Sequence, residues 1–223
     1  MIISKASAFS NVIPSKFDAD SLKIAAIAVA KKADIVLFIG GLNKNHHQDC
    51  EGGDRLSYEL PFGQNELINE ISSVNKNIGV VLISGNAVAM PWLPKVQGLV
   101  QSWYLGSESG HALADILSGD VNPSGKLPFT YPVKLTDNGA HYFGELSYPG
   151  DSIDQYYKED IFVGYRWHEH KKIRPQFAFG EGLSYTKFTI ENVRASENSA
   201  TENTDFQIIC DIQNIGNREG SEV

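Results

Sequence analysis

The sequence has little cysteine and no long apolar segment. Its 223 residues include only Cys50 and Cys210, which lie far apart in segments of different character. They neither suggest a disulfide framework nor supply paired metal ligands. No window approaches the roughly 20 apolar residues that span a bilayer, and residues 1–7 lack the basic and apolar regions of a signal peptide. We therefore expect a soluble chain without a membrane partner.

Clusters of positive charge and phosphate-binding motifs are also missing. The formal net charge is -8 with a pI near 5.2, so we expect no nucleic-acid partner. Residues 119–127 approach a phosphate loop, but the spacing is too long and Leu127 stands where Ser or Thr would coordinate magnesium. Residues 106–110 carry Glu108 where the nucleophile elbow of a hydrolase requires serine. We expect neither a cofactor nor a metal.

The first half of the chain alternates between helical and strand patterns, and 42% of all residues are hydrophobic, as in ordinary globular proteins. Short, β-branched apolar runs follow amphipathic segments, which predicts a parallel sheet covered by helices. The run at 34–40 is apolar after Asp34 and is expected to be buried on both faces. The predicted helices are 18–32, 64–74 and 107–117, and the predicted strands are 34–40, 78–83 and 98–104.

The second half has a different composition, rich in Pro, Gly and aromatic residues from Asn122 onward. Two further strands are predicted at 127–131 and 161–165. From a boundary near Leu183, polar and apolar residues alternate, as in antiparallel sandwich strands. About forty residues follow this boundary, too few for a sandwich of roughly 100 residues. We expect a fragment whose second domain is truncated, with 1–182 as the first domain and 183–223 as the second.

The loop at 41–63 is the first place to search for chemistry, because loops at the carboxyl ends of parallel strands line ligand crevices. It concentrates ionisable side chains. A metal site would use His46, His47, Asp49 and Cys50, but neighbours in an extended chain point to opposite sides and no second ligand cluster exists. A Cys50 nucleophile would need a positioned base, such as His47, and a third orienting group.

Two further interpretations of this loop stay open from the residues alone. In one, the loop is solvated and Asp54 and Arg55 pair with each other or cap the next helix, worth about 1 kcal/mol. In the other, Glu51 is a general acid, and the adjacent glycines let a sugar approach the backbone. Several aromatic residues could stack on a sugar ring, although packing in the core is the stronger expectation for each: Trp92, Trp103, Tyr104, Tyr165 and Trp167.

Several stretches together resemble the C-terminal half of family 3 glycoside hydrolases, such as bacterial β-glucosidases and β-xylosidases. They are Glu51-Gly-Gly-Asp-Arg-Leu with Leu60-Pro, the long run from Gly106 to Pro132, and the segments beginning at Tyr157 and Phe179. The resemblance implies a six-stranded α/β/α sandwich for 1–182, with a mostly parallel sheet. It also implies that the opening strands of a fibronectin type III-like domain follow.

The resemblance also implies roles for individual residues. Glu51 corresponds to the acid/base, whereas the nucleophile of the family is an Asp on an N-terminal barrel of about 250 residues, which a 223-residue chain cannot hold beside the sandwich. Asp54 and Arg55 are expected to hold the loop in shape, with a sugar hydroxyl contact for Arg55. His46, His47 and Asp49 are expected at the leaving-group side.

The expected function is therefore that of one part of a retaining β-glycosidase acting on β-linked glycosides or oligosaccharides at nonreducing ends. The N-terminal barrel would be its partner, and the chain alone would be inactive. A carbohydrate-binding or structural module is the alternative. A nucleotide- or flavin-binding domain has support only from the order of helices and strands. The resemblance suggests a periplasmic or extracellular location and leaves the sugar undetermined.

Overall fold

A computed structural model describes residues 19–223 except 46, 54, 198, 200 and 204. The described chain divides into two compact units. The first contains the residues up to Ser107 together with Thr130–Phe177, and the second contains Glu108–Phe129 and Ala178–Val223. None of the described helices combines the length and the apolar character that crossing a membrane requires.

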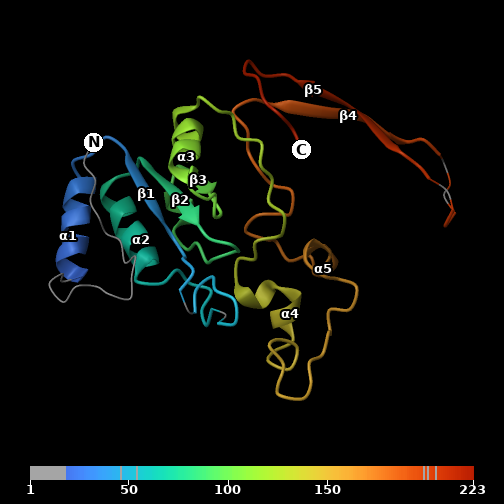
Figure 1. The fold of residues 1–223 in the computed structure, drawn as a ribbon, viewed down its shortest axis with the longest axis horizontal. Coiled ribbons are helices and arrows are strands. Elements are labelled where there is room, and N and C mark those ends of the chain that lie inside the picture. The colour runs from blue at the N-terminus through green and yellow to red at the C-terminus, as the bar shows by residue number, and fades with distance from the viewer. Residues whose placement is uncertain (1–18, 46, 54, 198, 200, 204) are drawn as a thin grey trace. The chain divides into compact units, whose positions relative to one another are not determined.

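The first unit is built on a parallel sheet. Its strands β1 (Val36–Gly41), β2 (Ile78–Ile83) and β3 (Gly98–Gln101) lie in that order, with Val36 opposite Ile78 and Gly79 opposite Gly98. Helices α1 (Ala19–Ala30) and α2 (Gln64–Val74) lie side by side next to β1 (Figure 1). The predicted alternation of helix and strand is confirmed, although the third strand is shorter than predicted.

The core of this unit is formed by α2 and the middle strand. Ile68, Ile71, Val80 and Leu82 are buried, as is Trp92, whose Nε1 donates to Asn65 Oδ1 at 2.7 Å. The prediction that β1 is buried on both faces is wrong. Leu37 and Ile39 are 45% and 53% exposed, whereas Val36, Phe38 and Gly40 are partly buried, so only one face of the strand is covered.

The rest of the first unit is largely irregular, with short helices α4 (Gly139–Tyr142) and α5 (Tyr165–Lys171). The strand predicted at 161–165 is wrong. Asp160 and Gly164 have positive φ angles of 55° and 64°, which interrupt an extended backbone, and α5 begins at the next residue. Trp167 anchors α5, because its buried ring donates from Nε1 to Asp137 O at 3.1 Å.

The strand predicted at 127–131 is also absent. Leu127 exchanges backbone hydrogen bonds with Gly180 and Glu181, and Tyr131 forms one isolated bridge with Phe177. Between these contacts stands Pro128, which has no N–H to donate to a ladder. The proline therefore prevents a continuous strand.

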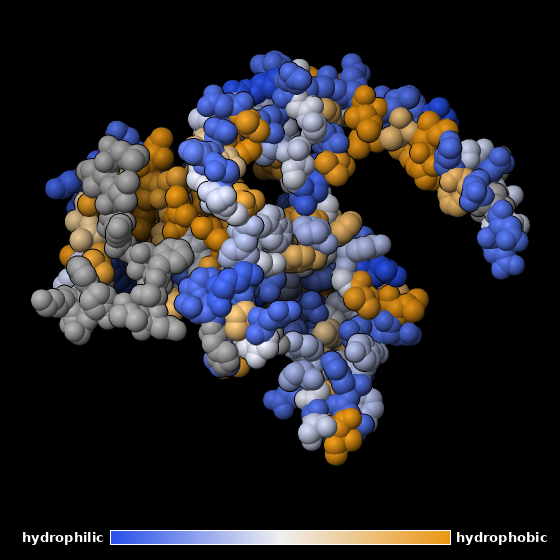
Figure 2. Space-filling model, in the orientation of Figure 1, coloured by the Kyte–Doolittle hydropathy of each residue, from blue (hydrophilic) through white to orange (hydrophobic). Residues whose placement is uncertain are grey.

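The second unit contains α3 (Ser109–Ser118) and the antiparallel pair β4 (Phe188–Ala195) and β5 (Ile208–Asn214). Apolar side chains line part of the β4–β5 ribbon (Figure 2). Asn122 stabilises the approach to the ribbon, because its Oδ1 accepts from Ser184 Oγ at 2.9 Å and from the Tyr185 N–H at 2.7 Å. The predicted fold class, an α/β domain with a mostly parallel sheet followed by the start of an all-β part, is confirmed. The parallel sheet of the described residues has three strands, however, rather than the six that the resemblance implies.

Candidate active site

The loop at 42–63 leaves the carboxyl end of β1, and Gln64 closes its base. Gln64 Oε1 accepts from the Gly41 N–H at 2.7 Å, and Gln64 Nε2 donates to the Gly41 carbonyl at 2.8 Å. Gly41 has a φ of 136°, and a Cβ there would lie 2.1 Å from the Ile83 carbonyl oxygen. Only glycine therefore allows β1 and β2 to approach this closely where the loop begins.

The first half of the loop is folded on itself by its own polar groups. The N–H of Asp49 donates to Asn43 O at 2.9 Å, and the buried Gln48 side chain accepts from the Asn43 N–H at 3.1 Å. The N–H of His47 donates to Gly53 O at 3.0 Å, which closes a ring around the intervening residues. This bonding gives the segment that carries Glu51 a defined shape.

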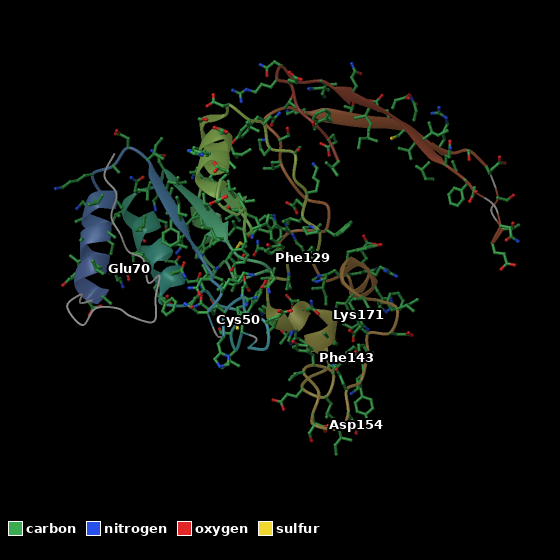
Figure 3. All side chains as sticks on the ribbon, viewed as in Figure 1. Cys50, Glu70, Phe129, Phe143, Asp154 and Lys171 are labelled. Atoms are coloured by element: carbon green, nitrogen blue, oxygen red, sulfur yellow. The ribbon has the colours of Figure 1, made fainter. Side chains whose placement is uncertain are left out.

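Glu51 lies in this ring with its side chain exposed. Gly52 has a φ of 72°, which side-chain-bearing residues rarely adopt, although an added Cβ would meet no atom within 4 Å. Cys50 lies in the loop beyond the end of the strands (Figure 3), and its Sγ faces the carbonyl oxygens of Glu51 and Gly53, each at 3.6 Å. Within the described part of the chain, no hydrogen bond or ion pair engages the Glu51 carboxyl group, so it is available to an external partner.

Asp49 connects the loop to the segments that follow the other two strands. Its Oδ2 accepts from the Gly85 N–H at 2.6 Å and from Tyr104 Oη at 2.9 Å. Burial raises the pKa of Tyr104, and the hydrogen bond to Asp49 raises it further, so the phenol stays protonated and remains a donor. Lys44 lies over the ring of Tyr104, with Nζ 4.5 Å from its centroid.

Arg55 connects the far side of the loop to the turn after β2. Its Nη2 donates to Ala87 O at 2.7 Å and to Asn86 Oδ1. Burial lowers the pKa of Arg55, while the charge of Asp49 opposes this shift. Its Nη1 is buried with no acceptor among the residues that the structure describes. Arg55 does not cap α2, which was one of the two alternatives in the solvated-loop interpretation, because Gly63 holds that position.

The structure thus places most of the predicted site residues on one loop, although His46 and Asp54 lie outside the described residues. His47 is exposed and has a φ of 61°. No group of three or more potential metal ligands occurs in the described ranges. The sequence did not indicate that Gln64, Gly85 and Asn86 hold the loop in place through hydrogen bonds. The packing expectation is confirmed for Trp92 and Trp167, which are 0% and 2% exposed, and is wrong for Tyr104 and Tyr165, which are 37% and 45% exposed.

A parallel sheet with a carboxyl-bearing loop at its carboxyl edge defines an α/β domain of the kind that presents substrate-facing residues at this edge. The comparison with known families then identifies it. Residues 3–165 match the Glycosyl hydrolase family 3 C-terminal domain, and the chain belongs to this family.

The relatives of the chain are named as β-glucosidases. The chain is 56% identical over 213 residues to β-glucosidase BoGH3A of Bacteroides ovatus, covering 96% of the chain and 28% of the relative. It is 45% identical over 200 residues to a β-glucosidase of Rhizobium radiobacter, covering 89% of the chain and 24% of the relative. The chain therefore spans about a quarter of the length of the curated relatives that it matches.

Solved structures show the same likeness. DesR, a β-glucosidase from Streptomyces venezuelae solved in complex with D-glucose, superimposes with a TM-score of 0.82 at 36% identity, covering 90% of this chain and 24% of that one. A β-glucosidase from Kluyveromyces marxianus gives a TM-score of 0.80 at 39% identity, with 91% and 24% covered. The likeness extends beyond the matched family domain, because it covers about nine-tenths of the chain.

Proposed function

We propose that the chain is part of a retaining, β-glucosidase-like hydrolase that removes β-linked sugars from nonreducing ends, and that Glu51 is its general acid/base. The observation that carries the proposal is the exposed Glu51 carboxyl group, which forms no hydrogen bond or ion pair with the described residues. The loop that carries it is held before Glu51 by Asp49 and after it by Arg55, which both bind the turn after β2. Membership of the glycosyl hydrolase family supports it, as do the β-glucosidase names of the relatives.

The chemistry needs two carboxyl groups about 5 to 5.5 Å apart. One attacks the anomeric carbon and forms a glycosyl-enzyme intermediate. The other, Glu51, protonates the departing oxygen and then accepts a proton from the water that hydrolyses the intermediate. The resemblance assigns the attacking Asp to a barrel domain, so we propose that the 223-residue chain alone has no turnover.

The neighbours of Glu51 receive supporting roles in this proposal. Arg55 holds the loop in shape through Asn86 and Ala87, and its unpaired Nη1 is a donor for an acceptor supplied from outside the described residues. Asp54 shares the loop-holding role by its place in the motif. His46 and the exposed His47 belong to the leaving-group side.

A hybrid enzyme tests the role of Glu51. In it, the chain replaces the matching segment of the Bacteroides ovatus relative, which is 56% identical. Glu51→Ala should lower kcat/KM for phenyl β-glucoside by about 10²- to 10⁴-fold, the usual contribution of general acid catalysis. The loss should be much smaller for dinitrophenyl β-glucoside, because this leaving group departs without a proton.

Glu145→Gln is the matched control, since Glu145 is exposed, belongs to the same unit and should leave both rates unchanged. Equal losses on the two substrates would contradict an acid role for Glu51. Full activity of Glu51→Ala, with sugar affinity intact, would instead favour a binding or structural module. The isolated chain is assayed beside the hybrid, and turnover that Glu51→Ala abolishes would place a nucleophile within these 223 residues.

A further inference from the structure

One oxygen atom joins the three segments that leave the carboxyl end of the sheet. Asp49 belongs to the loop after β1, Gly85 lies two residues after β2 ends at Ile83, and Tyr104 lies three residues after β3 ends at Gln101. Asp49 Oδ2 accepts from the Gly85 N–H at 2.6 Å and from Tyr104 Oη at 2.9 Å. Hydrogen bonds to carboxylates are shorter and about twice as strong as neutral ones. This carboxylate is therefore a junction between the three strands.

The junction lies close to Glu51 along the chain. Two consecutive Cα–Cα steps of about 3.8 Å separate the two residues, so the Glu51 Cα lies within about 7.6 Å of the Asp49 Cα. Four residues after Glu51, Arg55 binds Asn86 and Ala87, which directly follow Gly85 in the turn after β2. Both sides of the Glu51 segment are therefore tied to the same turn.

These hydrogen bonds restrict the backbone flexibility of the residues next to Glu51. Gly52 and Gly53 directly follow it, and glycine has the largest conformational entropy of any residue. An acid/base group must hold its position closely, because a displacement of about 1 Å can cost about 10²-fold in rate. A loop with two glycines at its functional residue therefore needs fixed points on either side.

We propose that Asp49 is a positioning residue for Glu51: its carboxylate fixes the acid/base loop to the segments that follow β2 and β3. The inference rests on the proposed function of Glu51. It differs from the sequence-based expectation that Asp49 contacts the sugar on the leaving-group side, because in this arrangement Asp49 acts through the loop and touches no substrate.

Hydrogen exchange in the 223-residue chain tests the structural half of the inference. Removing a hydrogen bond to a carboxylate corresponds to about ten- to a hundredfold in an opening equilibrium. Asp49→Ala should therefore speed exchange of the Gly85 amide and the amides at 47–53 by about that factor, and Asp49→Asn by less. The amides of β2 should be unchanged. Asp34→Asn is the control, because Asp34 is exposed at the opposite end of β1.

Kinetics of the hybrid enzyme test the functional half. Asp49→Asn and Tyr104→Phe should each lower kcat for phenyl β-glucoside by about 10- to 100-fold, with KM within about twofold. They should have little effect on kcat/KM for dinitrophenyl β-glucoside, because that constant reports the first step, in which this leaving group needs no proton. Asp34→Asn should change nothing. A raised KM with unchanged kcat would overturn the inference in favour of a sugar contact, and so would unchanged kinetics despite faster exchange.

The two proposals fail in different ways. Suppose that Glu51→Ala lowers kcat/KM much more for phenyl than for dinitrophenyl β-glucoside, while both Asp49→Asn and Tyr104→Phe leave kcat for phenyl β-glucoside unchanged. In that case only the positioning role is wrong. If Glu51→Ala keeps full activity, the proposed function itself is wrong and the positioning role falls with it. Should Asp49→Ala not fold, the more conservative Asp49→Asn and Tyr104→Phe variants still decide between these outcomes.

Discussion

Replacing Gln64 should destabilise the first unit, because this side chain closes the base of the loop. The side chain makes two hydrogen bonds with the Gly41 backbone, at 2.7 and 2.8 Å, and a third from Nε2 to Pro61 O at 3.0 Å. Each bond contributes about 0.5–1.5 kcal/mol. Gln64→Ala should therefore lower the free energy of unfolding by about 1.5–4.5 kcal/mol.

Gln64→Glu separates the two halves of this contact. The carboxylate keeps an acceptor for the Gly41 N–H but loses the donor to the Gly41 carbonyl and places negative charge against that oxygen. Its cost should be at least that of Gln64→Ala. The assay is urea unfolding followed by tryptophan fluorescence. The three tryptophans, Trp92, Trp103 and Trp167, all belong to the first unit, so the signal reports on that unit.

Gln97→Ala is the matched control, because Gln97 is exposed in the same unit and should shift stability by less than about 0.5 kcal/mol. The reasoning is refuted if Gln64→Ala costs no more than Gln97→Ala. It is also refuted if Gln64→Glu is as stable as the unsubstituted chain, since the carbonyl contact would then be unimportant.

Two further changes test the polar network around the loop. Burial raises the pKa of Tyr58 and Tyr131. Above about pH 10, the ordinary tyrosine pKa, these groups lose their protons in the unfolded state but keep them in the folded state. The free energy of unfolding should therefore fall as pH rises, by at most about 1.4 kcal/mol per pH unit for each group. Urea midpoints measured across this range should decline less steeply in Tyr131→Phe, and parallel curves would contradict the assignment. Arg55→Lys should cost about 1–2 kcal/mol, because an ammonium group cannot reproduce the guanidinium geometry, whereas Arg174→Lys, at an exposed site, should be neutral.

Much of the fold could be predicted because local patterns and tertiary packing agree. The helix at 64–74 and the strand at 78–83 were predicted with the bounds that the structure has, since the apolar positions of each pattern are largely the ones that are buried. The run at 161–165 reads as a strand from its apolar residues, but positive φ angles at Asp160 and Gly164 decide against it. Backbone conformation of this kind leaves no periodic signal in a single sequence.

The site could be predicted in part. The position of the loop follows from the rule that ligands bind at the carboxyl ends of parallel strands, and its motif leads to Glu51. The same rule brings the segments after β2 and β3 to this edge, which is the signal that could have pointed to Gly85 and Tyr104. Their bonds to Asp49 depend on side-chain directions within an irregular loop, which no spacing encodes. The domain boundary at Leu183 stays a prediction.

The most direct test of the central proposal is the product that Glu51→Ala forms with azide in the hybrid enzyme. If Glu51 is the acid/base of a retaining enzyme, the nucleophile still forms the glycosyl-enzyme intermediate, and azide attacks it without needing a base. Azide should then accelerate turnover of dinitrophenyl β-glucoside and yield β-glucosyl azide. Formation of α-glucosyl azide would identify Glu51 as the nucleophile, and the absence of any acceleration would contradict its role as acid/base.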